Sequence, residues 1–223
     1  MKDLLIFDMD GVLTDVSNSY REAIVLCVQH FTGQRVSREL IQEYKNQGGW
    51  NNDWDLSQHI AADLGVPVPH STIVAVFNEF FLGNNGKGLI TRETWFPESG
   101  LLERLATRYQ VGLFTGRLKY EAEISLNRFA PSMTFDPMIC AERVTQAKPS
   151  PEGLLSIVTR FPGRRLVYVG DTVDDARSAA GAGVPFIGIA AASHSRRDDV
   201  LALFAAEGAR AVIENINDIE SVL

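Results

Sequence analysis

Short apolar runs recur along the chain, and each of them ends in polar or glycine-rich residues. They span residues 4–7, 111–114, 166–169, 185–189 and, more weakly, 211–213. Helical periodicities lie between them, at residues 100–109, 120–129, 151–160 and 174–182. Uninterrupted apolar strands that alternate with helices are typical of a parallel sheet covered on both faces. We therefore predict an α/β fold with a Rossmann-like, doubly wound parallel sheet.

The gap between the first two runs is far longer than one crossover connection requires. Apolar stripes at helical spacing fill it, within residues 20–31, 40–44, 56–64 and 73–81. The glycine- and asparagine-rich segment 83–88 then ends this pattern. This predicts a helical insertion at residues 16–90, so that residues 1–15 and 91–223 form the sheet domain.

An acid pair follows the first run, at the sheet edge where parallel sheets bind their ligands. Asp8 and Asp10 come directly after this strand, and Gly11 follows them. Two carboxylates so close together repel each other, and a divalent cation removes that cost. Ligands that are all oxygen suit Mg²⁺. A solvated pair of carboxylates at a turn is the alternative interpretation.

Thr115, Gly116 and Arg117 follow the second run. A hydroxyl and a free backbone N–H at a strand-to-helix turn can hold phosphoryl oxygens. A capping threonine before a turn glycine would have the same sequence, so this motif alone does not decide. Arg117 either adds charge to a site or lies at the surface, and the pattern leaves both open.

A lysine and a second acid cluster complete the set. Lys148 precedes a proline, which favours an extended loop, and Ser150 with Pro151 is typical of a helix N-cap and first helical residue. Asp171 lies at the tip of the strand at 166–169, where a metal ligand would be placed. Asp174 and Asp175 come three and four residues later, where a helix dipole also favours acids.

The order of these motifs carries more information than any one of them. A lone lysine is usually exposed, and acids in a first helical turn are common. Here an acid pair, a Thr-Gly, a lysine and an acid cluster follow successive strands of one predicted sheet. One shared site for phosphate and metal explains this order better than four coincidences.

Composition narrows the class of protein. Of the 223 residues, 45% are hydrophobic and 22% charged, which is ordinary globular usage. The 21 basic and 28 acidic side chains give a net charge of −7 without any basic run, so we expect neither nucleic acid nor a membrane as partner. Cys27 and Cys140 are interpreted as reduced core thiols, and the N-terminus leaves no room for a signal peptide. We expect a cytoplasmic monomer or homodimer.

The ordered motifs resemble those of the haloacid dehalogenase superfamily of phosphohydrolases, over the whole chain. The insertion resembles the helical cap domain of subfamily I, in its IA-like form. This resemblance implies that Asp8 is the nucleophile, which forms an aspartyl-phosphate, and that Asp10 is the general acid/base. It implies that Thr115 and the Gly116 N–H bind the phosphoryl group and that Lys148 neutralises it.

The resemblance also implies a Mg²⁺ cofactor, with the following ligand set: Asp8, the Asp10 main-chain carbonyl, Asp171 and Asp175. Asp175 matches the second acid of the family's fourth motif, and the adjacent Asp174 keeps that assignment open. The function implied is a Mg²⁺-dependent phosphomonoesterase that acts on a small phosphorylated metabolite.

Substrate choice is expected to come from the insertion, because the core motifs contact only the phosphoryl group. The segment 45–54 offers glycines, amides and aromatics, although a linker with core tryptophans is the alternative. Lys45 resembles by position a cap lysine that some relatives use on substrate, and we predict that Lys45 and Gly49 contact the substrate. The stretches 19–23 and 49–54 also resemble a small clade whose members in part accompany histidine-biosynthesis enzymes, which places histidinol phosphate in a substrate screen.

Three other functions share part of this pattern. A phosphomutase would use every core residue, and the sequence does not separate it from a phosphatase. A dehalogenase of the superfamily needs no Mg²⁺ and no second acid, so Asp10 and Asp171 argue against it. A phospho-receiver domain has no helical insertion after its acceptor aspartate, and the acid two residues beyond Asp8 also counts against it.

Overall fold

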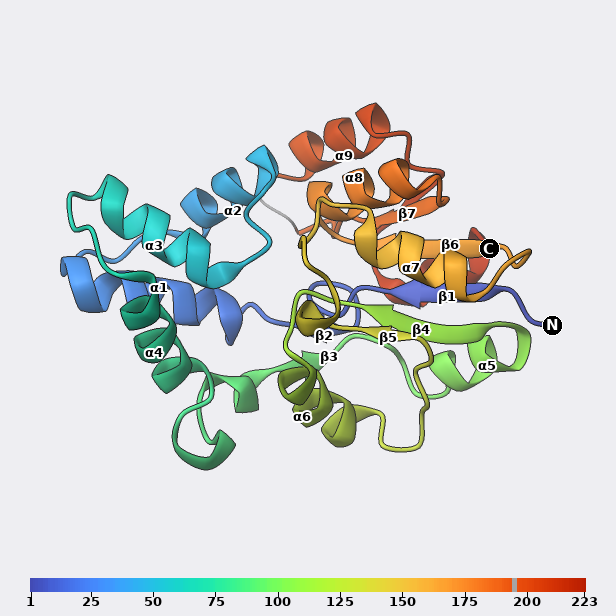
Figure 1. The fold of residues 1–223 in the computed structure, drawn as a ribbon, viewed down its shortest axis with the longest axis horizontal. Helices are drawn as coiled ribbons and strands as arrows, with labels where there is room; N and C mark the ends of the chain where they lie inside the picture. Colours follow the sequence, from blue (N-terminus) through green and yellow to red (C-terminus); the bar gives the residue numbers. More distant parts are fainter. Residues whose placement is uncertain (194–195) are drawn as a thin grey trace. The chain divides into compact units, whose positions relative to one another are not determined.

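The computed structural model describes residues 1–193 and 196–223, which form two compact units (Figure 1). We call Met1–Thr14 with Trp95–Leu223 the sheet unit and Asp15–Thr94 the helical unit. The helical unit spans Asp15–Thr94 and so includes all of the short helix η2 (Leu89–Arg92), which crosses the predicted boundary at residue 90 and is anchored by Leu89 and Ile90 in the apolar core of that unit.

The sheet unit contains six parallel strands. They are β1 (Leu4–Phe7), β4 (Gln110–Phe114), β5 (Met138–Ile139), β6 (Leu166–Gly170), β7 (Phe186–Ile189) and β8 (Ala211–Ile213). Their order in the sheet is β5-β4-β1-β6-β7-β8, with every neighbouring pair parallel. The first strand is therefore central, and the chain crosses over it to build both halves. The predicted α/β fold is confirmed.

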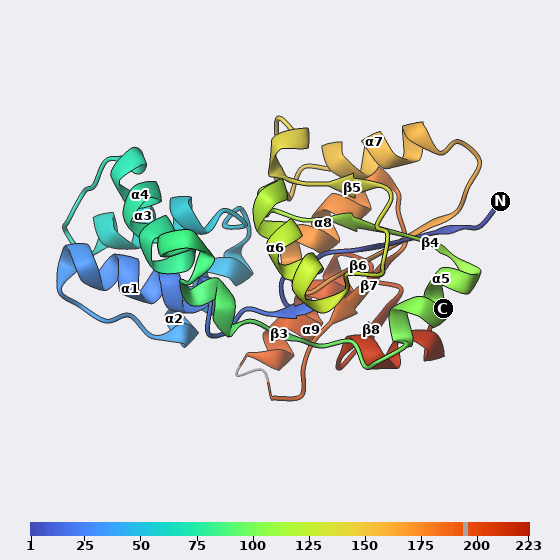
Figure 2. The same cartoon turned by 90° about the horizontal axis from the view of Figure 1, so that it is seen from below.

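Helices cover both faces of this sheet. They are α5 (Leu101–Arg108), α6 (Lys119–Phe129), α7 (Glu152–Arg160), α8 (Val173–Ala182) and α9 (Arg197–Ala206), with the short helices η3 (Ala141–Arg143) and η4 (Ile216–Ser221). Side chains alternate along a strand, so Leu5 and Phe7 of β1 pack with α5 and η4, whereas Leu4 and Ile6 pack with α7, α8 and α9. Figures 1 and 2 show α7 and α8 on one side of the strands and α5 on the other.

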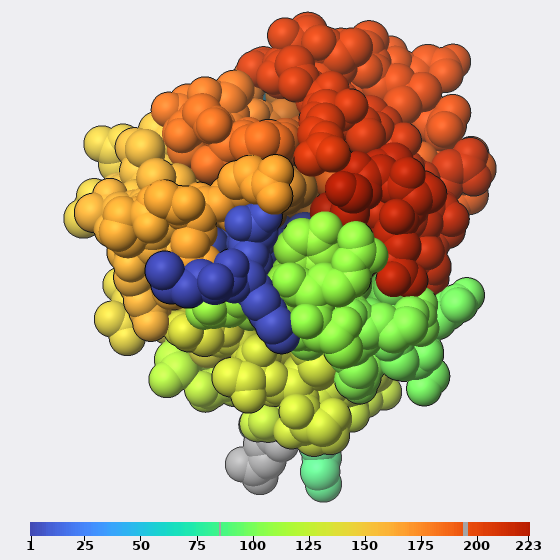
Figure 3. Space-filling model, turned by 90° about the vertical axis from the view of Figure 1, so that its right-hand side faces the viewer, coloured from blue at the N-terminus to red at the C-terminus, as the bar shows by residue number. Residues whose placement is uncertain are grey.

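The N-terminal residues are held within the sheet unit. In Figure 3 the N-terminal residues lie between the green segment around α5 and the orange segment around α7 and β6. Lys2 Nζ donates to the Ala106 carbonyl at 2.6 Å, and Arg165 pairs with Asp3 at 2.9 Å. These contacts fix the start of β1 and hence the position of the residues that follow it.

The helical unit consists of four helices and two short ones around its own core. They are α1 (Tyr20–Thr32), α2 (Arg38–Gln47), α3 (Asp53–Asp63), α4 (His70–Phe81), η1 (Asn84–Gly86) and η2. Ser37 and Asn52 cap α2 and α3 through side-chain oxygens that accept backbone N–H groups. The segments that join the two units contain the paired strands β2 (Thr14–Asp15) and β3 (Thr94–Trp95).

Local details differ from the sequence prediction in three places. Strand β5 has two residues, too few to show a pattern, and α9 was not predicted although Val200 and Phe204 lie one turn apart and are both buried. Helix α7 begins at Glu152 with Pro151 as its N-cap, so the predicted cap at Ser150 is wrong by one residue, although the Ser150 hydroxyl accepts the Glu152 N–H at 3.3 Å. Among the described residues no helix is both long and apolar enough to cross a membrane.

Candidate active site

The register of the three central strands brings the predicted motifs to one sheet edge. Phe7 lies beside Leu113 of β4 and Val169 of β6, so the residues after each strand are neighbours. The Asp8 N–H continues the ladder by donating to the Val169 carbonyl at 2.8 Å, and the Thr115 N–H donates to Ile139 at 2.9 Å. Distant motifs thus meet because parallel strands end together.

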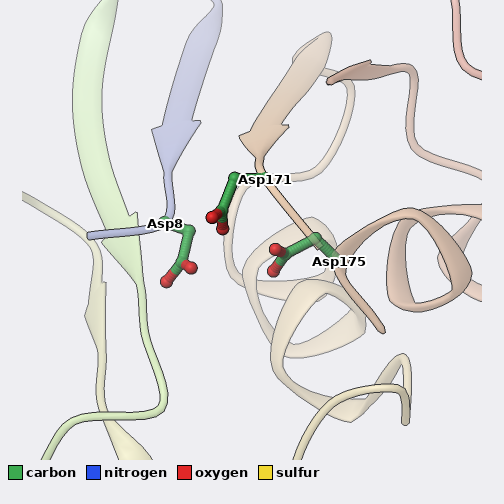
Figure 4. A group of neighbouring side chains, drawn as sticks. All are labelled: Asp8, Asp171 and Asp175. Atoms are coloured by element: carbon green, nitrogen blue, oxygen red, sulfur yellow. The ribbon is translucent and has the colours of Figure 1, made fainter. Parts of the chain in front are cut away.

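Three carboxylates converge at this edge, as Figure 4 shows. One oxygen each of Asp8, Asp171 and Asp175 lies within 4.8 Å of the others. Asp8 and Asp175 are buried and Asp171 is half-buried. The structure therefore places Asp175, rather than its neighbour Asp174, in this carboxylate cluster.

Two glycines make room for the cluster. A Cβ on Gly11, whose φ is +74°, would lie 1.9 Å from Asp171 Oδ2, and a Cβ on Gly170 would lie 2.4 Å from the Cβ of Asp175. Any larger residue at either position would push a carboxylate out of place. Both glycines are therefore part of the site, although they carry no functional group.

Lys148 connects two of the three carboxylates. Its Nζ lies 3.0 Å from Asp8 Oδ1 and 2.7 Å from Asp175 Oδ1, and it donates to the Tyr168 hydroxyl at 3.1 Å. Burial alone would lower the pKa of this amine, but the carboxylates of Asp175 and Asp8 together raise it above its usual range. Lys148 is consequently a fixed, buried cation, and it lies in the loop before α7, in a turn that the Ser150 N–H closes by donating to the Ala147 carbonyl at 3.0 Å.

Asp175 is held from two sides. Its Oδ2 accepts the Thr172 N–H at 3.0 Å and the Thr172 hydroxyl at 2.6 Å, which closes a capping box at the start of α8. Its Oδ1 accepts the Tyr168 hydroxyl at 2.7 Å as well as Lys148. Burial would raise the pKa of Asp175, but the charge of Lys148 and these hydrogen bonds outweigh it and lower the pKa. Asp175 thus stays ionised and orients the lysine.

Asp8 has the opposite character. Burial raises its pKa well above the usual range, and Asp175, Asp10 and Asp171 add to this, while Lys148 opposes it. Its Oδ1 is buried and accepts no hydrogen bond of good geometry among the described residues. A buried carboxylate that is crowded by like charges favours a further cation beside it, in addition to Lys148. The residues present therefore fit a divalent ion that binds oxygen.

The motif after β4 contributes a buried threonine and an unexpected ion pair. The Thr115 hydroxyl is buried and accepts the Arg117 N–H at 3.2 Å, and Gly116 is exposed. The Arg117 guanidinium is fully buried and contacts the carboxylate of Asp10. Sequence reasoning left Arg117 open, because the strand order that places it beside Asp10 does not show whether its side chain is buried or exposed.

Two further contributors were missed. Tyr168 was assigned to the apolar interior of a strand, and its apolar neighbours gave no signal that its hydroxyl bonds Lys148 and Asp175. Thr172 did carry a signal, since a threonine three residues before an acid is typical of a capping box. That spacing could have distinguished Asp175 from Asp174.

The predicted substrate residues of the insertion lie in the helical unit. Lys45 Nζ pairs with Asp53 at 2.7 Å and donates to the Trp50 carbonyl at 3.2 Å. Gly49 is exposed with φ +82°, and Trp50 packs against the core of the helical unit and stacks on His59. The predicted contact of Lys45 and Gly49 with substrate stays a prediction.

A sequence model of the haloacid dehalogenase-like hydrolases matches residues 5–189. The chain belongs to this family. The resemblance predicted from the ordered motifs is thereby confirmed.

Of three proteins that are similar to this chain, two are named phosphatases. The chain is 34% identical over 194 residues to an imidazoleglycerol-phosphate dehydratase of Phytophthora nicotianae, a match that covers 83% of this chain but only 42% of that protein. It is 25% identical over 210 residues to a phosphoglycolate phosphatase of Yersinia pestis, covering 89% and 88% of the two chains. A phosphatase structure from Thermococcus thioreducens superposes with a TM-score of 0.66 at 26% identity, covering 92% of this chain and 99% of the other.

Proposed function

We propose that this hydrolase is a Mg²⁺-dependent phosphomonoesterase, which cleaves a small phosphorylated metabolite through an aspartyl-phosphate on Asp8. The observation that carries the proposal is the position of Asp8, with Lys148 at 3.0 Å on one of its oxygens and the carboxylates of Asp171 and Asp175 beside it. A nucleophilic carboxylate can approach an anionic phosphoryl group only where cations offset the repulsion.

The metal would be held by Asp8, Asp171 and the main-chain carbonyl of Asp10. Asp175 adds its charge to the cluster, but both of its oxygens already accept hydrogen bonds from the protein, so its main part is to hold Lys148. When bound, Mg²⁺ supplies positive charge to the phosphoryl oxygens and keeps the nearby carboxylates ionised.

The first step transfers the phosphoryl group to the protein. A carboxylate oxygen of Asp8 forms a bond to phosphorus while the bond from phosphorus to the leaving oxygen breaks. Asp10 donates its proton to that oxygen, which leaves as an alcohol. Thr115, the Gly116 N–H and Lys148 hold the phosphoryl oxygens during the transfer.

The second step releases phosphate. Asp10, now a carboxylate, takes a proton from water as the water oxygen bonds to phosphorus, and the bond between phosphorus and Asp8 breaks. Asp8 and the protonated Asp10 are thereby regenerated. Proton transfer by a positioned acid/base such as Asp10 raises the rate of each step about 10²–10⁴-fold.

The relatives support the class of reaction and suggest where to look for the substrate. The Yersinia pestis relative is named a phosphatase, which favours hydrolysis. The substrate named for the Phytophthora nicotianae relative is a phosphate ester that carries an imidazole ring, although this chain matches less than half of that protein. We therefore include imidazole-bearing esters such as histidinol phosphate among the candidate substrates.

The helical unit is the proposed source of selectivity, through the loop that contains Gly49 and through Lys45. We also propose a cytoplasmic location, with a monomer or a homodimer as the functional state. Cys27 and Cys140 are both buried free thiols, which suits a reducing compartment.

The test is phosphate release from p-nitrophenyl phosphate and from a panel of metabolite phosphates, each with Mg²⁺ and with EDTA. We expect metal-dependent release, lost in Asp8→Asn, and strongest for one class of ester. Isomerisation of a sugar phosphate without release of free phosphate would instead identify a phosphomutase. Release that is unaffected by EDTA, or that Asp8→Asn retains, would overturn the proposal.

A further inference from the structure

Arg117 is a buried cation that lies outside the carboxylate cluster. Its guanidinium Nε donates to Asp10 Oδ1 at 2.7 Å, and Nη2 lies 2.6 Å from the same oxygen. Nη1 donates to the Ser125 hydroxyl at 2.8 Å, on helix α6. The arginine side chain is 0% exposed, whereas that of Asp10 is 31% exposed. A fully buried guanidinium thus contacts a carboxylate that still reaches solvent.

The backbone of Arg117 is fixed as firmly as its side chain. Its N–H donates to the Thr115 hydroxyl at 3.2 Å, and its carbonyl accepts the Ala141 N–H at 3.0 Å. A guanidinium is planar and permanently charged, so it directs its N–H groups in set directions. Burying such a charge is costly unless it is paired. The position of the Asp10 carboxylate is therefore set by a rigid partner.

The contact is asymmetric in a way that matters for proton transfer. Both Nε and Nη2 of Arg117 approach Oδ1 of Asp10, at 2.7 Å and 2.6 Å, so this oxygen is the one that the guanidinium holds. A carboxyl group whose one oxygen accepts two N–H groups carries its proton on the other oxygen. Oδ2 is thus the oxygen through which Asp10 can give and take a proton.

We propose that Arg117 is a positioning residue, which holds Asp10 through Oδ1 so that the Oδ2–H is aimed at the leaving oxygen. This inference rests on the proposed function, because it assigns a partner to its acid/base. In the first step the proton moves from Oδ2 to the leaving oxygen as the bond from that oxygen to phosphorus breaks. In the second, a proton of water returns to Oδ2 as the water oxygen bonds to phosphorus.

This role has a signature in the leaving group. The p-nitrophenolate ion is stable and departs without a proton. The phenolate of phenyl phosphate is more basic, so its departure depends more strongly on protonation, although the two esters are nearly the same size. A defect in Asp10 must therefore reduce hydrolysis of phenyl phosphate more than hydrolysis of p-nitrophenyl phosphate. A general distortion of the site would reduce both alike.

The experiment measures kcat and KM of both esters, with Mg²⁺, for wild type, Arg117→Ala, Arg117→Lys, Asp10→Asn and the Arg117→Ala/Asp10→Asn double variant. We expect Arg117→Ala to lower kcat for phenyl phosphate about 10²-fold. The loss in kcat for p-nitrophenyl phosphate should be about tenfold or less, and KM should change little for both esters. Arg117→Lys restores the charge but not the planar fork, so it should recover only part of kcat. The double variant should be no slower than Asp10→Asn, because the arginine acts through Asp10.

Two further variants keep the result interpretable. Ser125→Ala removes the hydroxyl that anchors Nη1, and it should show the same leaving-group signature with a loss of a few fold. It decides the matter if the Arg117 variants do not fold. Arg143→Gln replaces an exposed arginine of the same unit and should leave both esters at wild-type rates.

The outcomes separate this inference from the proposed function. Equal losses on both esters, or losses in the double variant that multiply, would overturn the positioning role while the phosphatase stands. If wild type hydrolyses neither these esters nor any metabolite phosphate of the panel with Mg²⁺, the proposed function is wrong and the role of Arg117 falls with it.

Discussion

The two units of this protein differ in how deeply their ion pairs are buried. In the sheet unit a buried cation and two buried carboxylates meet at one sheet edge, where Lys148 pairs with Asp8 and Asp175. In the helical unit the ion pair between Lys45 and Asp53 is partly exposed, and the buried carboxylate of Glu93 accepts the Ser19 hydroxyl at 3.3 Å beside a mainly apolar core. Burying charged side chains costs free energy, and clusters of buried charges are typical of functional sites. The comparison indicates that the catalytic groups belong to the sheet unit and that the helical unit is stabilised by apolar packing.

Replacing Asp8, the proposed nucleophile, should have the largest effect. Asp8→Asn should reduce phosphate release to background, because the amide forms no acyl-phosphate. The matched control is Asp63→Asn in the helical unit, an exposed carboxylate that pairs with Tyr44 and His59 and should leave kcat unchanged. Steady-state assays with Mg²⁺ test both variants, and circular dichroism checks their folding. Substantial turnover by Asp8→Asn would mean that the buried charges serve another purpose.

Two glycines with similar backbone geometry form the next pair. Gly11 in the sheet unit has φ +74° and Gly33 in the helical unit has φ +71°, so alanine should cost each about 1–2 kcal/mol of backbone strain. Only the Gly11 methyl group would meet a functional atom, Asp171 Oδ2. We expect Gly11→Ala to weaken the apparent Mg²⁺ affinity about 10–100-fold. Gly33→Ala should lower the melting temperature without changing the Mg²⁺ dependence of kcat.

The same Mg²⁺ titration tests directly whether the space that Gly11 leaves for the Asp171 carboxylate is needed for metal binding. If Gly11→Ala bound Mg²⁺ like wild type, Asp171 would have to tolerate a displacement, and its assignment as a ligand would be wrong.

A pair of tyrosines should show a smaller effect. The Tyr168 hydroxyl is buried between Asp175 and Lys148, whereas the Tyr44 hydroxyl donates to exposed Asp63 at 2.6 Å. Tyr168→Phe should lower kcat about tenfold, since outer partners of site residues typically matter this much, and cost about 1.5–3 kcal/mol of stability. Tyr44→Phe should cost less than about 1 kcal/mol and leave kcat unchanged. Urea unfolding and kinetics of both variants provide the comparison, and equal effects in the two would contradict it.

The two cysteines give the mildest test, one in each unit. Burial raises the pKa of Cys27 to about 12, and burial with the nearby Glu142 raises that of Cys140 to about 11. Only the thiolate reacts, so at pH 8 labelling of either thiol should be slow and should rise as the pH approaches these values. Because a ligand stabilises the region that binds it, Mg²⁺ should slow labelling of Cys140 more than that of Cys27. Rapid labelling of either thiol in the native protein at pH 8 would show that its region is open.

The strand ends explain how much of the site could be predicted. Asp8, Thr115 and Asp171 each follow an apolar run, and the rule that parallel strands end at one edge is enough to bring them together. Lys148 lies in a loop and was found only because the other motifs were present. The contacts that were missed depend on side-chain geometry: Arg117 follows the strand next to that of Asp10, but the sequence did not show that their side chains pair, and Tyr168 is polar at one atom within a strand that is otherwise apolar.

The pairing of β2 with β3 has a consequence for the history of such chains. The insertion leaves and re-enters through two strands that lie side by side, about 4.8 Å apart. An insertion of almost any length could be accommodated between β2 and β3, or shortened to a loop, without changing the path of the strands on either side. The sheet unit can in this way acquire different inserted domains during evolution, while the residues that determine its own fold stay the same.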